Sequence, residues 1–192
     1  MTTLQEQIDK FKNDYYSNNG GKKSSMNFTG KSRQKTDIAQ KVSEQFSINQ
    51  LLERTIYKLP GKNHIFIDYL IFKQYANESN YEDIITYMLH IYDDCIETDG
   101  TFIVHVNLDS FSTTAAERYK NIIERFNSRF MQDEDTIYMR RMENMYIYYP
   151  PSMLQMIYTM LKPIMNPEVY TKTIVIPKNE SGNKLKELFS TI

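Results

Sequence analysis

Apolar side chains recur along the chain at two different spacings, which predict helices in some stretches and strands in others. In residues 37–59 they lie mostly three or four positions apart, as on one face of a helix, until Pro60 and Gly61 interrupt the pattern. The next stretch, residues 64–72 with the sequence HIFIDYLIF, is rich in β-branched and aromatic residues, which favour a strand. One amphipathic helix followed by a strand is therefore expected here.

Helices and strands alternate in the same way through the rest of the chain. Residues 79–98 and 114–130 each open with a capping box, Ser-Asn-Tyr-Glu in the first and Thr-Ala-Ala-Glu in the second, whose side chains can satisfy the first free amides of a helix. The remaining predicted elements are strands at 101–109, 142–150 and 172–177, and helices at 152–165 and 181–192. Strands that alternate with helices imply right-handed crossovers, so the predicted fold class is α/β with a mainly parallel sheet and crossover helices.

The first 35 residues differ in composition from the rest. Residues 17–35 contain two adjacent glycines, several Ser and Asn, five basic side chains and almost nothing to bury, which is typical of a flexible segment. Residues 1–35 hold seven basic and three acidic side chains, a net charge of +4. We therefore predict a flexible basic arm at residues 1–35 and a single α/β domain at residues 36–192. The arm either contacts phosphate groups or only keeps the protein in solution.

Overall charge gives no general attraction to polyanions. The 192 residues include 23 basic and 24 acidic side chains, a formal net charge of -1. Nucleic acid is therefore not an expected partner, and contact with an anionic membrane would have to come from the basic arm.

Cysteine usage and the start of the chain favour a cytoplasmic protein. Cys95 is the single cysteine, so no internal disulfide or thiolate cluster can form. The first residues are polar and charged where a signal peptide needs an apolar core, and no apolar run approaches the roughly 20 residues that span a bilayer.

Residues with catalytic potential do not form a recognisable catalytic pattern. His64, His90 and His105 are too far apart in sequence for a paired metal site, and no glycine-rich phosphate loop or Gly-x-Ser-x-Gly motif occurs. Asp109 ends a predicted strand, where it can either serve a site or cap the next turn, and Cys95 lies on the inner face of its predicted helix as a small apolar residue. We therefore expect no enzyme, no metal and no cofactor.

The predicted helix at residues 152–165 is apolar around most of its circumference. Its polar positions, Ser152, Gln155, Thr159 and Lys162, form one narrow stripe, and much of the remainder is Met, Leu and Ile. An ordinary surface helix buries one stripe, so this helix needs apolar contacts on two sides. Either two protein elements flank it, or one side faces an apolar ligand, which methionine-rich surfaces accommodate well.

The same part of the chain resembles the CRAL-TRIO lipid-binding domain family. In residues 142–176, Pro150 matches the proline that follows a family strand, and Leu154 and Tyr158 match the inward-facing Phe and Trp positions. Residues 162–165, Lys-Pro-Ile-Met, match the family's Lys-Pro-Phe-Leu. The resemblance implies that the helix at residues 152–165 lies beside a ligand pocket and acts as its gate.

The resemblance extends over about residues 62–190 and includes departures. Tyr148 stands where the family has Asn, and no counterpart of the family's Leu-Pro-x-x-x-Gly-Gly segment occurs before Ile192. No residues match those that hold a phosphoinositide headgroup, so the resemblance assigns no particular lipid.

Two functional hypotheses follow. The first is non-catalytic binding of a lipid or other small apolar ligand in a CRAL-TRIO-like pocket, for lipid transfer or sensing. Its candidate ligand-facing or gate residues are Met153, Leu154, Ile157, Tyr158 and Leu161, and its candidate pocket floor is Val104, Val106, Met145 and Ile147.

The alternative is a protein–protein interaction module, as in the branch of the family found in Rho GTPase-activating proteins. In that case the pocket is collapsed and filled by Phe102, Tyr146, Tyr148 and Tyr158.

Overall fold

A computed structural model describes residues 3–18, 28–130 and 137–190, and these residues contain a five-stranded sheet. The strands are β1 (Ile56–Lys58), β2 (His64–Asp68), β3 (Phe102–Asn107), β4 (Met142–Tyr148) and β5 (Thr173–Val175). They lie side by side in sequence order, with β1 antiparallel to β2 and the other neighbours parallel. The predicted α/β class with a mainly parallel sheet is confirmed.

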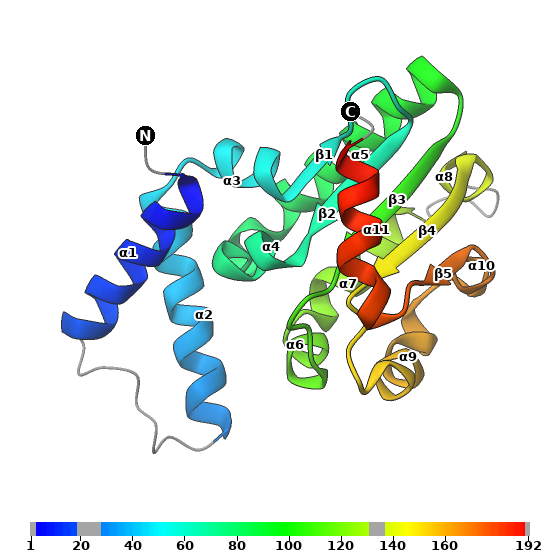
Figure 1. The fold of residues 1–192 in the computed structure, drawn as a ribbon. Coiled ribbons are helices and arrows are strands. Elements are labelled where there is room, and N and C mark those ends of the chain that lie inside the picture. The colour runs from blue at the N-terminus through cyan, green and yellow to red at the C-terminus, as the bar shows by residue number, and fades with distance from the viewer. Residues whose placement is uncertain (1–2, 19–27, 131–136, 191–192) are drawn as a thin grey trace.

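Helices cover the two faces of the sheet unequally. The helices of the described residues are α1 (Leu4–Asn18), α2 (Phe28–Gln45), α3 (Ile48–Thr55), α4 (Tyr69–Tyr75), α5 (Tyr81–Asp99), α6 (Thr113–Arg118), α7 (Lys120–Phe130), α8 (Ile137–Arg141), α9 (Leu154–Leu161), α10 (Pro167–Thr171) and α11 (Lys178–Ser190), with 3-10 turns η1 (Glu78–Asn80) and η2 (Lys162–Ile164). In Figure 1, α11 crosses the near face of the sheet, while α5 and α7 lie behind it. In the described part of the chain, no helix combines the length and apolarity needed to cross a membrane.

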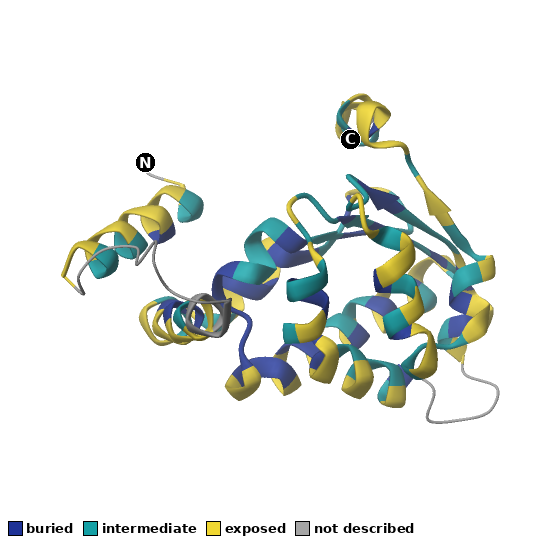
Figure 2. Ribbon diagram, turned by 90° about the horizontal axis from the view of Figure 1, so that it is seen from below, coloured by how far each residue is buried: buried dark blue, intermediate teal, exposed yellow. Residues whose placement is uncertain are grey.

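The main core lies between the sheet and the layer that contains α5 and α7. Val104 and Ile65 point from the sheet into this layer, where they join Ile85 and other buried residues of α5. Tyr92 of α5 stacks on Phe102 of β3 with ring centroids 4.7 Å apart. Figure 2 shows buried residues concentrated here, and α11 set apart on the opposite side of the sheet with many exposed residues.

The predicted single helix at residues 37–59 is wrong in its extent. The stretch contains the end of α2, then α3, then β1. The chain turns at Ser47, whose ψ of 126° is not helical. Ile56 then lies opposite Ile67 of β2, so the hydrogen bonds of a sheet edge replace a further helical turn. The local periodicity does not encode this pairing, because the partner strand lies further along the chain.

The strand predicted at residues 64–72 is too long. β2 ends at Asp68, whose Oδ1 accepts a hydrogen bond from the Leu70 N–H at 2.9 Å and so caps α4. Aspartate is a favourable N-cap residue, and it outweighs the strand propensity of the aromatic residues that follow.

The predicted helix caps are displaced to polar residues upstream. Asn77 Oδ1 accepts a hydrogen bond from the Ser79 N–H at 3.0 Å at the start of η1, which leads into α5, and Ser112 Oγ accepts one from the Ala115 N–H at 3.3 Å at the start of α6. Gly100 ends α5 as predicted, with a φ of 79° that glycine adopts without strain.

Helices occupy the described part of the segment predicted to be a flexible arm. Residues 3–18 include α1, α2 begins at residue 28, and residues 19–27 lie outside the described residues. Ile8 of α1 is fully buried in the main core cluster, and Phe11 packs edge to face against Phe46 at 6.0 Å. The amphipathic pattern of α1 was missed because the composition of the neighbouring stretch dominated the prediction. The division at residue 35 stays a prediction.

We predict that Ile8→Ala lowers the free energy of unfolding by about 2–5 kcal/mol, because truncating a fully buried apolar side chain leaves a cavity. Urea unfolding measures the change. The matched control is Ile137→Ala, since Ile137 is 46% exposed, with an expected change within about 0.5 kcal/mol. Equally small effects for both variants would contradict the packing of α1 on the core.

Candidate functional site

The loops after β3 and β4 lie at the carboxyl edge of the sheet, where open α/β sheets bind ligands. Ser110 after β3 has a φ of 63° and Tyr149 after β4 has a φ of 50°; among the described residues, no other non-glycine residue has a positive φ. Such backbone persists where neighbouring structure enforces it, and it is common at binding sites. Here the Tyr149 N–H donates to Ser181 Oγ of α11 at 2.8 Å, and Lys73 of α4 donates to Ser110 Oγ at 2.6 Å.

Helix α9 crosses this edge between β4 and β5. With η2 it replaces the longer helix predicted at residues 152–165. Ile157 and Leu161 are buried against Ala116 of α6, and these three residues form a small cluster that we call the α9 seam. Two methionines are exposed here: Met153, the residue that precedes α9, is 47% exposed, and Met156 on the outer side of α9 is 54% exposed. The helix thus has apolar residues on both its inner and its outer side.

A pocket of about 200 Å³ opens beside the first turn of α9. Its walls come from the loop after β3, through Phe111 and Ser112, and from the segment after β4, through Tyr149 and Met153. Lys178 at the start of α11 completes it. The pocket is small for a lipid, so a larger ligand would require α9 to move.

The four predicted floor residues share one face of the sheet. Val104 lies opposite Met145 and Val106 opposite Ile147, and alternation along a strand directs all four side chains to the same side. Val104 and Ile147 are buried, whereas Val106 and Met145 are half-buried at the margin of the core cluster. The structure therefore brings these four residues together.

The five predicted residues of the gate helix divide between two sides of α9. Ile157 and Leu161 belong to the α9 seam, and Met153 is exposed beside the small pocket. Leu154 and Tyr158 are half-buried, with the Tyr158 ring 4.1 Å from that of Tyr170. One helix cannot direct every apolar residue to one cavity, and the contact of these residues with a ligand stays a prediction.

The segment from the end of α3 to α11 matches a model of a known protein family. The model described as CRAL/TRIO domain matches residues 55–191. The chain belongs to the CRAL/TRIO domain family. This family binds lipophilic ligands. A search of curated proteins found no match to the chain. The matched region contains the sheet and α9 and excludes α1 and α2.

The residues that resemble the CRAL/TRIO motif have identifiable structural roles. Pro150 follows β4 and precedes the turn into α9, and Pro163 lies within η2, just after α9 ends. Lys172, just before β5, donates to the carbonyl oxygens of Met139 and Met142, the second at 2.7 Å. This lysine therefore connects the start of β5 with α8 and the first residue of β4.

Tyr148, the departure from the family's Asn, belongs to a histidine–tyrosine stack on the sheet face nearer α11. Its hydroxyl lies 2.9 Å from His105 Nδ1, and His105 Nε2 lies 3.1 Å from His64 Nδ1. The ring of Tyr146 stacks on His105 with centroids 5.2 Å apart. The spacing of His64 and His105 in the sequence did not predict their contact, because only the parallel register of β2 and β3 makes them neighbours.

Burial governs the protonation of this histidine–tyrosine stack. Removal from water, helped by the nearby His64 and Lys62, lowers the pKa of His105 to about 4. Burial likewise raises the pKa of the Tyr148 hydroxyl to about 12. Both side chains are therefore neutral at pH 7, and His105 and Tyr148 interact as uncharged hydrogen-bonding partners.

Neither Asp109 nor Cys95 forms part of an evident reactive group. Burial raises the pKa of the Cys95 thiol to about 11, which suits a small apolar core residue rather than a nucleophile. The Asp109 N–H donates to Asn107 Oδ1 at 3.1 Å within the turn after β3. Within residues 3–18, 28–130 and 137–190, no group of three or more His, Cys, Asp or Glu is placed to hold a metal ion.

We predict that the protein loses stability between about pH 6.5 and about pH 4 through His105. The folded-state pKa of about 4 lies below the roughly 6.5 of an unfolded histidine, so the unfolded chain takes up the proton first as the pH falls. Between about pH 7.5 and about pH 5, His105→Phe should lose about 1–2 kcal/mol less unfolding free energy than the wild type. Urea unfolding at the two pH values measures this difference.

The control is His90→Phe, because His90 is exposed on α5 and outside the stack. It should keep the wild-type pH dependence. A His105→Phe variant with the same pH dependence as the wild type would contradict the neutral, buried state of His105.

Proposed function

We propose that this CRAL/TRIO chain is a binding protein rather than an enzyme, and that it holds one lipophilic ligand between α9 and the layer of α6 and α7. The observation that carries the proposal is the position of α9, which lies across the carboxyl edge of the sheet with apolar residues on both sides. Lipid transfer or lipid sensing would use such a site. The four floor residues, including Val106 and Ile147, would meet the inner part of the ligand.

Displacement of α9 is energetically feasible. Complete burial of a Leu or Ile side chain stabilises a structure by about 1.5–3 kcal/mol, so the two large side chains of the α9 seam contribute about 3–6 kcal/mol. A ligand whose contacts with the opened site correspond to a nanomolar Kd, about 12 kcal/mol, would exceed that cost by about 6–9 kcal/mol. Binding of one apolar chain can therefore offset the loss of the seam.

The exposed side of α9 supports a route for the ligand. Met153 and Met156 present flexible, polarisable side chains on the outer surface of the same helix. Movement of α9 would expose both its faces to an incoming apolar ligand, with the small pocket beside Met153 as the point where opening begins.

A protein–protein interaction module is the second candidate. The favourable observation is that Ala116, Ile157 and Leu161 already fill the space between α6 and α9 with the chain's own side chains. A chain with this permanently closed seam would use its outer surface, including the exposed methionines of α9, to bind another protein.

A reducible disulfide that fixes α9 in place distinguishes the two candidate functions. We predict that the double variant Ala116→Cys/Ile157→Cys, oxidised to a disulfide across the α9 seam, takes up a fluorescent fatty acid at least about tenfold less than its reduced form. The same molecules are compared before and after reduction, and a free-thiol assay verifies the disulfide. Cys95 is buried and does not compete for the bond.

The two single-cysteine variants are the controls, and reducing agent should not change their uptake. Equal uptake by the oxidised and reduced double variant would contradict a ligand site beneath α9. Absence of uptake by the wild type and by every reduced variant would favour the interaction module.

A further inference from the structure

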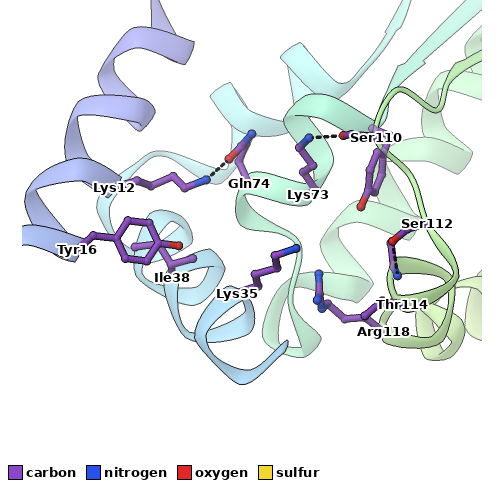
Figure 3. Close-up of a pocket in the computed structure, with 12 residues that line it drawn as sticks. Lys12, Tyr16, Lys35, Ile38, Lys73, Gln74, Ser110, Ser112, Thr114 and Arg118 are labelled. Atoms are coloured by element: carbon purple, nitrogen blue, oxygen red, sulfur yellow. Dashed lines mark hydrogen bonds between the residues drawn. The ribbon is translucent and has the colours of Figure 1, made fainter. Parts of the chain in front are cut away.

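A second pocket, of about 290 Å³, lies outside the α9 seam and combines four cationic side chains. It opens between the N-terminal helices and the α/β domain (Figure 3). Lys12 comes from α1, Lys35 from α2, Lys73 from α4 and Arg118 from α6. We call this the four-cation pocket. Among the described residues that line it, none is acidic.

The cationic groups are directed at the same space. Figure 3 shows the Lys35 ammonium and the Arg118 guanidinium extending toward each other across the pocket. Lys73 donates to the neutral hydroxyl of Ser110, and Lys12 donates to the neutral side-chain oxygen of Gln74. These two hydrogen bonds fix the direction of the side chains, and the acceptor in each is an uncharged oxygen.

Charges of both signs act on the Lys73 ammonium. Burial lowers the pKa of Lys73, Asp109 opposes this shift, Lys35 adds to it, and Asp68 opposes it. Four cations around one small space therefore gain from an anion that lies among them.

Chemistry and size indicate the class of anion. Arg and Lys bind phosphate oxygens through charge-assisted hydrogen bonds, and the hydroxyl groups of Ser112 and Thr114 add neutral donors to the lining. Several cations suit a multivalent anion better than a single carboxylate. The volume lies at the lower end of the range for ligand pockets, which suits a compact group.

We propose that the four-cation pocket binds a ligand that carries two or more phosphate groups, either as a free polyphosphate or as a phospholipid headgroup. The site needs α1 and α2 as well as the α/β domain, so such a ligand would also hold the N-terminal helices on the domain. It gives a specific role to the excess positive charge of the first 35 residues. The site does not depend on the ligand proposed beneath α9.

Binding of two probes to the full chain tests the proposal. Isothermal titration calorimetry uses inorganic pyrophosphate, and co-sedimentation uses phosphatidylcholine vesicles with and without about 10% phosphatidylinositol phosphate. The test variant is Lys35→Gln/Lys73→Gln, and Lys35→Gln alone tests the site with an exposed side chain whose loss does not threaten folding. The matched control is Lys41→Gln/Lys184→Gln, which removes two exposed lysines that pair with glutamates outside the pocket.

We expect saturable binding by the wild type, at least about tenfold weaker binding by the double variant, about threefold weaker binding by Lys35→Gln, and a change below about twofold for the control.

Pyrophosphate binding with these losses assigns a free phosphate ligand, and binding to phosphoinositide vesicles alone with the same losses assigns a lipid headgroup. No binding of either probe, or equal weakening in the test and control double variants, would overturn the proposal. The disulfide across the α9 seam should leave phosphate binding unchanged, which separates this site from the proposed lipophilic site.

Discussion

Parallel pairing of β2, β3, β4 and β5 in sequence order is the constraint on which the rest of the structure depends. Each connection between parallel strands must cross back over the sheet, and right-handed crossovers between successive neighbours put their helices on the same face. That face forms the main core with α5 and α7. The loops after β3 and β4 consequently meet at one edge, where α9 closes over them and where Ser110 and Tyr149 adopt left-handed backbone.

The two pockets described at this edge share the turn after β3. Ser110 and Ser112 line both the four-cation pocket and the smaller pocket beside α9. The two pockets therefore have part of their walls in common. Ser112 also caps α6, the helix that supplies Ala116 to the α9 seam and Arg118 to the cations. One short helix thus connects the apolar and the basic parts of the molecule.

Patterns local in sequence predicted much of the fold, whereas contacts between distant residues decided the parts that were missed. The branched and aromatic run before Pro150 specified β4, and Gly100 specified the end of α5. The pairing of Ile56 with Ile67 did not appear in the helical periodicity that surrounds Ile56, because the strand partner outweighs it. The packing of Ile8 could not be predicted from α1 alone, since the burial depends on residues of other elements, among them α2.

The same distinction applies to the candidate sites. The wide apolar surface of residues 152–165 is a local property, so the sequence alone indicates α9 as part of a candidate site. The four-cation pocket is not local, because Lys12 and Arg118 are remote in sequence and line one pocket only in the folded chain. In the sequence, the pocket was indicated only by the excess of basic residues in the first 35 positions. This excess suggested contact with phosphate but did not indicate which other residues would complete the site.

Native mass spectrometry of the chain purified from cells without detergent, followed by organic extraction, tests the proposed lipophilic site most directly. We predict a bound species with a mass in the lipid range, recovered in the extract at up to one molecule per chain. A protein that carries no such species, and that remains unliganded after incubation with mixed lipid vesicles, would contradict it.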